Sequence, residues 1–277
     1  MTDVLNLTAW KNNSFTKIKD IGLTILDFGF IHCDATYDVM KTKNNEILFF
    51  DYHYDRYVES CKYFNFTPIT NIQEIVNELI KKNNVDDVFV WVLNWRGIPP
   101  SGSPRDLNGP EHQCVYVKPY YTIKKSEDMI LGIHKDNRRS SDDVIPQKYK
   151  NFSWIELTKA QKFANENDFD SAILLDREGY ITEGPGFGIC FIDKNNTVIT
   201  PKYNCLQSVT INVVEDVCKK IGLKFVRKNI TVAEAFSTNE AFICSTSGGI
   251  TPIKTLNHMS YKNDKTKNLM EYFDKEK

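Results

Sequence analysis

The sequence predicts an α+β fold in two domains. Segments typical of strands outnumber segments typical of helices in both halves, and several follow one another directly. A doubly wound parallel sheet would instead alternate strands and helices. At 277 residues the chain is also longer than a typical domain of about 100–150 residues. We therefore expect a small N-terminal domain over residues 1–119 and a larger domain over 120–277, with a linker at 120–125.

The first half is predicted to form strands and two helices. Strands are expected where β-branched, aromatic or other apolar residues gather between turn residues: 8–10, 23–30, 47–50, 87–93 and 113–119. Apolar residues recur at helical spacing over 51–64 and 71–82. Four prolines and three glycines fall within 95–110, which predicts a long irregular loop. Loops of this length are often functional.

The second half is predicted to mix helices and strands more evenly. Helices are expected over 153–167, 210–221 and 232–236, the second of them ending at Gly222, a favourable C-cap residue. The expected strands are 172–176, 180–183, 188–192, 197–200, 223–227 and 241–244.

Charge and composition exclude several classes of protein. With 35 basic and 36 acidic residues, the net charge of −1 does not favour nucleic acid or an anionic membrane as a partner. The longest apolar window, 21–31, is too short to span a bilayer and contains Asp27. No export signal is visible at the N-terminus. Seven cysteines without CxxC spacing are expected to be reduced thiols. These features predict a soluble cytoplasmic protein.

Common catalytic motifs are also missing. The five histidines are scattered without an HxxxH pair, so no metal site is expected. The sequence has no GxSxG elbow and no Walker-type Gly-Lys-Ser/Thr. The glycines of 184–188 lie between predicted strands and do not open a helix, which argues against dinucleotide binding.

The remaining candidates are an acid, a lysine and two possible anion-binding segments. Glu183 ends a predicted strand, and Lys150 precedes a predicted helix. Residues 208–210 start another helix, where unpaired N–H groups and the helix dipole suit a phosphate. Residues 245–249 offer hydroxyl groups and glycines after a strand. Each segment alone also fits an ordinary helix cap or turn.

Together these segments resemble the class IV, fold-type IV aminotransferases that use pyridoxal 5'-phosphate. The resemblance covers residue 20 to about 255 and rests on four segments in the family's order: 28–38 (FGFIHCDATYD), 53–56 (HYDR), 181–187 (ITEGPGF), and 206–210 (LQSVT) followed by 245–252 (STSGGITP). Within the family, HCDATYD, KNFSW from Lys150 and TSGGITP are most similar to the (R)-selective amine transaminase branch.

The resemblance implies that Lys150 holds the cofactor as a Schiff base and moves the proton at the reacting carbon. Lys148 is the neighbouring alternative. Lys150 matches the family motif in frame and stands 33 residues before Glu183, a spacing that suits the family.

The same resemblance assigns the other cofactor contacts. Glu183 would keep the pyridine nitrogen protonated, and Arg56 would bind the phosphate through its planar donor fork, with His53 packing in support. The family's remaining cofactor contacts fall on Leu206, Val209, Thr210, Thr246 and Ser247. Many relatives have Gly and Arg where this chain has Ser208 and Ile211, so one polar contact behind the phosphate is expected to be missing.

The substrate pocket carries weaker signals. Tyr37 and His32 match pocket residues of the (R)-amine branch, and Tyr37 also matches a tyrosine of D-amino-acid transaminases. Arg105 lies in a loop similar to the one that carries their carboxylate-binding arginine. Leu107 stands where that family has a histidine, so Arg105 could equally be a solvated loop residue.

The expected reaction transfers an amino group between an amine or amino acid and a 2-oxo acid, with (R)-amines or D-amino acids as first expectation. L-branched-chain amino-acid transfer or an aminodeoxychorismate-lyase-like reaction would use the same site. A non-catalytic binding protein on this fold is a further alternative, disfavoured by the presence of Lys150, Glu183 and Arg56. Family membership also implies a homodimer. After Thr255 the chain lacks the glycine-rich hairpin of relatives, which leaves the terminal structure open.

Overall fold

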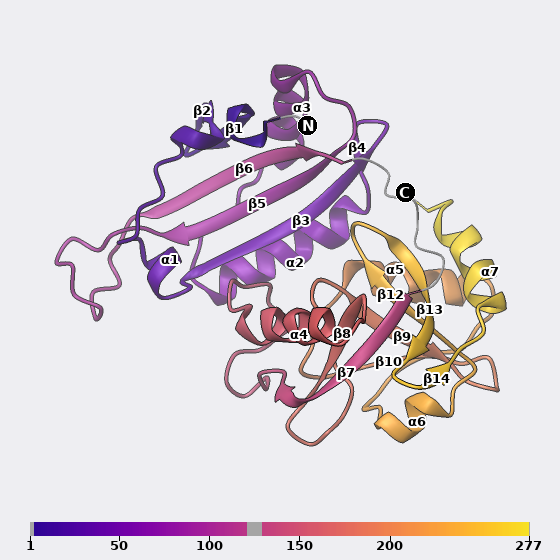
Figure 1. Ribbon diagram of the computed structural model, residues 1–277. Helices are drawn as coiled ribbons and strands as arrows, with labels where there is room; N and C mark the ends of the chain where they lie inside the picture. Colours follow the sequence, from indigo (N-terminus) through magenta and orange to yellow (C-terminus); the bar gives the residue numbers. More distant parts are fainter. Residues whose placement is uncertain (1–2, 121–128, 277) are drawn as a thin grey trace. The chain divides into compact units, whose positions relative to one another are not determined.

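The computed structural model describes residues 3–120 and 129–276 (Figure 1). These residues form two compact units. One contains 3–120 together with Tyr149–Ser153, and the other contains 129–148 and 154–276. The linker expected at 120–125 lies, apart from Tyr120, outside the described residues.

An antiparallel sheet organises the first unit, with strand order β2-β1-β6-β5-β3-β4 (Figure 1). Its strands are β1 (Thr8–Lys11), β2 (Ser14–Lys17), β3 (Ala35–Lys43), β4 (Glu46–Ile47), β5 (Val88–Arg96) and β6 (Glu111–Pro119). The helices are η1 (Val4–Asn6), η2 (Ile18–Asp20), α1 (Phe28–Ile31), α2 (Phe50–Tyr63) and α3 (Ile72–Asn83).

Helices α2 and α3 cover one face of this sheet. Tyr57 of α2 and Leu79 of α3 are fully buried against Met40, Val90 and other sheet residues. The two predicted helices are thus present within one residue or so of their expected bounds. Asn84 ends α3 in the left-handed conformation, which asparagine adopts more readily than most residues.

The prediction of a strand over residues 23–30 is wrong. Leu23, Ile25 and Leu26 are exposed, and Thr24 N donates to Asp27 Oδ2 in a turn before α1. An apolar run of this length does not by itself distinguish a strand from other structure. The strand that pairs with β5 is instead β3, which the sequence did not predict.

The second unit contains a mixed sheet, with order β11-β10-β9-β12-β13-β7-β8 and with β14 paired to β13. Pairs β7–β8, β7–β13 and β10–β11 are parallel, and the others are antiparallel. The strands are β7 (Met129–Arg138), β8 (Ser171–Leu175), β9 (Gly188–Ile192), β10 (Val198–Thr200), β11 (Phe225–Arg227), β12 (Glu240–Ser245), β13 (Gly249–Leu256) and β14 (Met259–Ser260). The α+β prediction is confirmed.

Four helices of the second unit lie among the described residues: α4 (Ile155–Glu166), α5 (Val209–Lys220), α6 (Val232–Phe236) and α7 (Asp264–Phe273). The first three were predicted, and Gly222 follows α5 with a φ of 74°. The predicted strand 180–183 forms only isolated bridges. Strands β7 and β13 and helix α7 were not predicted. Buried Glu240 accepts hydrogen bonds from the first turn of α7, which fixes the terminal segment that the sequence left open.

Residues Tyr149–Ser153 make their contacts with the first unit, although the sequence boundaries put them in the second domain. Asn151 pairs with Thr36 of β3 as an isolated antiparallel bridge. The Phe152 ring lies 4.7 Å from the Tyr37 ring. The segment around Lys150 is thereby held on β3.

Candidate functional site

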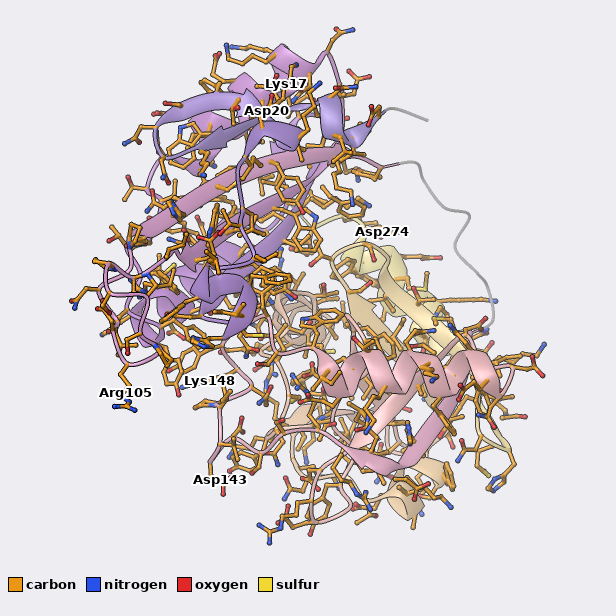
Figure 2. The ribbon with its side chains drawn as sticks, turned by 60° about the vertical axis from the view of Figure 1, so that its left-hand side comes forward. Lys17, Asp20, Arg105, Asp143, Lys148 and Asp274 are labelled. Atoms are coloured by element: carbon orange, nitrogen blue, oxygen red, sulfur yellow. The ribbon has the colours of Figure 1, made fainter. Side chains whose placement is uncertain are left out.

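Lys150 is fixed by its backbone on both sides. Thr36 Oγ1 donates to Lys150 O at 2.6 Å, and Lys150 N donates to Ser60 Oγ of α2 at 3.2 Å. The half-buried side chain places Nζ 4.5 Å from the centre of the Tyr37 ring. The neighbouring Lys148 is exposed (Figure 2). The structure therefore gives Lys150 a fixed position beside an aromatic ring and leaves Lys148 at the surface.

Arg56 and His53 share one acceptor, the carboxylate of Asp38 on β3. Arg56 Nε and Nη2 donate to the two oxygens of Asp38 at 2.8 Å each, and His53 Nδ1 lies 2.8 Å from Oδ1. Burial would raise the pKa of Asp38, but the charges of Arg56 and His53 and their hydrogen bonds hold it well below its usual range. Burial lowers the pKa of His53 against the opposing effect of Asp38, which favours the neutral ring at pH 7.

Sequence reasoning did not assign a role to Asp38, although a signal existed. His53 and Arg56 are three residues apart and so lie on one helical face. His53 is buried and Arg56 is half-buried, so their polar groups need partners within the fold. The motif 28–38 that precedes this helix offers two acidic residues, Asp34 and Asp38.

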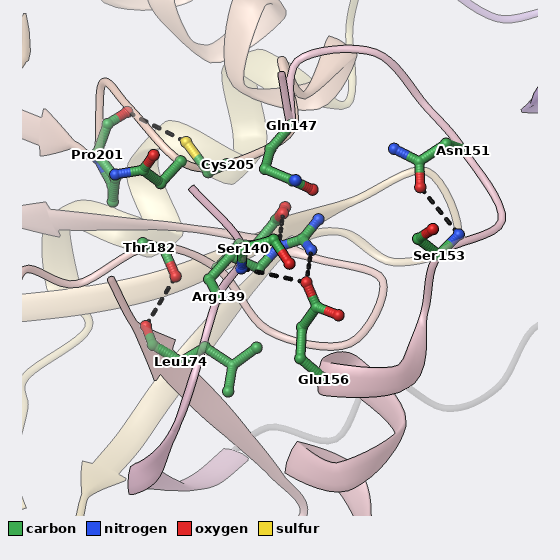
Figure 3. Close-up of polar contacts among 12 residues, drawn as sticks. Arg139, Ser140, Gln147, Asn151, Ser153, Glu156, Leu174, Thr182, Pro201 and Cys205 are labelled. Carbon is green, nitrogen blue, oxygen red and sulfur yellow. Dashed lines mark hydrogen bonds and ion pairs between the residues drawn. The ribbon is translucent and has the colours of Figure 1, made fainter. Parts of the chain in front are cut away.

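Glu183 lies in the second unit and forms an ion pair with Arg139. The side chain is buried, and Oε1 accepts from Arg139 Nε at 2.8 Å. Arg139 Nη1 also donates to Glu156 Oε1 of α4 at 2.6 Å (Figure 3). Burial opposes the charged form of Arg139, yet Glu183 and Glu156 raise its pKa above the usual value. The two carboxylates therefore share one permanent cation.

The backbone around Glu183 is fixed by close packing. Leu174 N donates to Glu183 O at 3.0 Å, and Thr182 Oγ1 donates to Leu174 O at 2.8 Å (Figure 3). A Cβ on Gly184 would lie 2.1 Å from the Phe187 ring and 2.7 Å from Ala172 O. Glycine is therefore required directly after Glu183.

The N-terminus of α5 is a candidate anion site. Ser208 Oγ accepts from Ile211 N at 3.3 Å and caps the helix. In the described part of the chain the backbone N–H groups of Val209 and Thr210 have no acceptor, although both residues are buried. Unpaired N–H groups of this kind bind phosphate oxygens. A Cβ on Gly188 would come within 2.6 Å of Ile211 Cδ1, so glycine there lets β9 approach this helix start.

The second predicted anion segment closes on itself as a turn. Ser245 Oγ accepts from Gly248 N at 3.0 Å and lies 3.1 Å from Ser247 Oγ. Thr246 is half-buried and Ser247 is exposed. Leu206, also expected at the cofactor, is half-buried in the second unit.

The predicted substrate residues have different surroundings. Tyr37 is buried beneath Lys150 Nζ, whereas His32 is exposed at the end of α1 with its ring against Phe28. Arg105 is exposed in the loop between β5 and β6 (Figure 2). In this loop Asp106 accepts from Ser101 and Asn108, so the loop is held by its own side chains.

Other site types find little support among residues 3–120 and 129–276. Within that part of the chain, no three His, Cys, Asp or Glu side chains are grouped as metal ligands. All seven cysteines are unbridged. None of the helices described has the length and apolar character needed to cross a bilayer.

Comparison with known proteins gives one family and one fold. Residues 35–256 match the family described as amino-transferase class IV. A Methanocaldococcus jannaschii protein whose name assigns it, provisionally, to the branched-chain-amino-acid aminotransferases is 27% identical over 253 residues, covering 89% of this chain and 87% of that protein. The branched-chain-amino-acid aminotransferase of Pseudomonas aeruginosa is 27% identical over 210 residues, covering 73% and 68%.

Solved structures agree on the fold. The branched-chain aminotransferase of Thermoproteus uzoniensis with norvaline superposes with a TM-score of 0.89 at 19% identity, covering 97% of this chain and 93% of that one. The branched-chain amino acid aminotransferase of Thermobaculum terrenum, in its PLP form, gives a TM-score of 0.86 at 20% identity, covering 98% and 94%.

Proposed function

The chain belongs to the class IV aminotransferase family, and from this membership we propose that it is a pyridoxal-phosphate enzyme that transfers the amino group of an amino acid with an apolar, branched side chain to a 2-oxo acid. The observation that carries the proposal is the family match over residues 35–256, which spans Arg56, Lys150 and Glu183.

The side chains present fit such a cofactor. For its phosphate, the second unit offers two unpaired N–H groups at the start of α5. The family resemblance assigns the phosphate to the Arg56 guanidinium of the first unit, which Asp38 orients. Its aldehyde requires an amine in a fixed place, which Lys150 supplies. Its ring nitrogen requires a carboxylate, for which we propose Glu183. Leu206, Thr246 and Ser247 complete the proposed cofactor contacts.

The cofactor supplies an electron sink for the carbanion formed at the substrate carbon. The chain would supply the proton transfer: Lys150 Nζ, once released by the substrate amine, would take the proton from the substrate carbon as general base and give it to C4′ of the cofactor as general acid, and in the second half-reaction it would carry a proton the opposite way. The hydrogen bonds from Thr36 to Lys150 O and from Lys150 N to Ser60 hold the main chain of the lysine, which limits the region that Nζ can reach. Glu183, held by Arg139, keeps its carboxylate in place throughout.

The proposed substrate follows the alternative left open by the sequence, not its first expectation. Motif likeness indicated (R)-amines or D-amino acids, but the relatives described above bear branched-chain names. His32 and Arg105, two of the three residues that suggested the first expectation, are exposed. Tyr37 remains the proposed pocket residue for either substrate class, the (R)-amines and D-amino acids or the branched-chain amino acids. A homodimer remains the family expectation, and its test is sedimentation of the purified protein.

A donor panel tests the proposal. Purified protein is incubated with pyridoxal phosphate and then with L-leucine, L-valine, D-alanine or (R)-1-phenylethylamine, using 2-oxoglutarate or pyruvate as acceptor. We expect an absorbance band near roughly 400 nm in the loaded protein and turnover with the L-branched-chain donors.

Two other results would each exclude part of the proposal. Turnover only with D-alanine or the (R)-amine would restore the first expectation of the sequence. Absence of both the absorbance band and turnover would support a non-catalytic binding protein.

A further inference from the structure

The second unit contains a cavity between its sheet and α6. Phe191 of β9 and Ile199 of β10 are directly paired residues of neighbouring strands, and both line the cavity together with Ile230. We call these three residues the floor of the cavity, and all of them belong to the apolar core of this unit. The cavity has a volume of about 230 Å³, below the roughly 300–1,000 Å³ of most ligand pockets. It therefore suits a molecule about as large as an amino acid.

This cavity and the candidate anion site at the start of α5 lie on opposite faces of the second sheet. Successive residues of a strand point to opposite faces. On β9, Gly188 faces α5, because a Cβ there would meet Ile211. Phe191 has the opposite parity and belongs to the core against which Phe236 of α6 packs. A molecule in the cavity would thus be separated from the start of α5 by the sheet itself.

The polar part of the lining contains one acid and one lysine that already have partners. Lys228 Nζ donates to Glu234 Oε1 at 3.0 Å. The other oxygen of Glu234 accepts from Thr231 N at 2.8 Å and from Thr231 Oγ1 at 3.0 Å. This pair therefore closes one side of the cavity without a net charge.

The turn after β9 adds a second acid and a second lysine whose charges are available. Asp193 Oδ1 accepts from Asn195 N and Thr197 N at 2.8 Å each, which fixes the carboxylate. Within residues 3–120 and 129–276, Asp193 Oδ2 accepts no hydrogen bond and the exposed Lys194 has no ion-pair partner. Both residues line the cavity. Its rim thus offers one negative acceptor and one positive donor above an apolar floor.

We propose that this cavity binds a free α-amino acid with an apolar side chain, at a site separate from the proposed catalytic one. Lys194 would bind the carboxylate and Asp193 Oδ2 the ammonium group, since hydrogen bonds between charged groups are the stronger ones. The side chain would lie on the floor, where burial of apolar surface favours binding. The matching 2-oxo acid lacks the ammonium group and the matching amine lacks the carboxylate, so each leaves one charge of the rim unpaired. The inference does not depend on the proposed function.

The test is calorimetric titration of protein that cannot transaminate. Protein loaded with pyridoxal phosphate is reduced with borohydride and titrated with L-leucine, with 4-methyl-2-oxopentanoate, with 3-methylbutylamine and with glycine. The second and third probes each lack one charge of L-leucine, and glycine lacks its side chain. We expect L-leucine to bind about tenfold or more tightly than each of the other three.

Two variants assign the two charges to the rim. Lys194→Ala should weaken L-leucine by about tenfold, to the affinity of 3-methylbutylamine. Asp193→Asn keeps an oxygen for Asn195 N and Thr197 N but removes the negative charge, and it should bring L-leucine to the affinity of 4-methyl-2-oxopentanoate. Lys224→Ala is the matched control, because Lys224 is an exposed lysine of the same unit that does not line the cavity. It should bind L-leucine as the unmodified protein does.

Equal binding of L-leucine and glycine, or no binding of either, would overturn the inference. So would an L-leucine affinity that is unchanged in Lys194→Ala or falls equally in Lys224→Ala. Failure of the proposed function is seen separately, because the loaded protein would then lack its absorbance band before reduction while the L-leucine titration would be unaffected.

Discussion

Arg139 connects Glu183 to Glu156, with Nε donating to the former at 2.8 Å and Nη1 to the latter at 2.6 Å. All three side chains are buried. A buried carboxylate without a partner is costly, so the guanidinium allows Glu183 to remain ionised away from water.

Replacing Arg139 should therefore destabilise the protein. Arg139→Gln leaves two buried carboxylates without a cation, and we expect the free energy of unfolding to fall by about 3–5 kcal/mol. Cofactor affinity should fall as well, because Glu183 loses the donor that orients it. Arg138→Gln is the control, since Arg138 is the adjacent residue and is exposed. Urea unfolding and cofactor titration measure both effects. Equal stability of the two variants would contradict this account.

Asp38 should make stability depend on pH. Its pKa is lowered in the folded state, so its contribution is fully present above the unfolded value of about 3.9 and is lost as the pH falls through the lower folded value. We expect Asp38→Asn to lose about 3 kcal/mol or more of unfolding free energy at pH 7. The difference from the unmodified protein should shrink below about pH 4.

The control for Asp38 is Asp55→Asn, a change at an exposed position beside Arg56. Urea unfolding at several pH values compares the two variants. A stability difference for Asp38→Asn that stays constant down to low pH would show that the carboxylate charge is not the cause.

The two neighbouring lysines should differ sharply in catalysis. Lys150→Ala removes the fixed amine, and we expect kcat to fall by about 10²–10⁴-fold or more. Lys148→Ala changes an exposed side chain and should keep most of the activity. Steady-state kinetics with L-leucine and 2-oxoglutarate measure both. Larger loss in Lys148→Ala would identify the other lysine as the catalytic residue.

Substitution of Arg105 tests whether this residue binds the substrate carboxylate. If the loop brings the Arg105 guanidinium to the substrate carboxylate, Arg105→Ala removes a charge-assisted hydrogen bond. The KM for amino acids and 2-oxo acids should then rise by about tenfold or more. Single-turnover reaction with a simple amine should be unchanged. Equal loss for both kinds of substrate would assign Arg105 a structural role.

Local patterns predicted much of the fold. The bounds of α6 were predicted as found, at a helix whose capping box joins Thr231 and Glu234. Helix α3 was predicted from its apolar spacing. The apolar run 23–30 failed because its side chains are exposed, a property set by surrounding structure. Strand β3 was missed because its residues are buried on both faces for most of its length, so no alternation marks it.

Candidate site residues could be chosen from the sequence where they belong to contiguous motifs. Lys150, Glu183 and Thr210 were chosen from such motifs, and their roles remain proposals. Arg139 was missed because its partner Glu183 is 44 residues away, and no local pattern joins them. The spacing of His53 and Arg56 indicated a shared acidic partner, but it did not distinguish Asp38 from Asp34 of the same motif. Contacts between distant segments require the folded chain.

The central claim is that Lys150 binds the cofactor. Borohydride reduction of the loaded protein, which fixes a cofactor bound through nitrogen, followed by peptide mass spectrometry tests it most directly. The account predicts the modification on Lys150, with Lys148 in the same peptide unmodified. Modification of Lys148 or of a lysine elsewhere, or none at all, would contradict it.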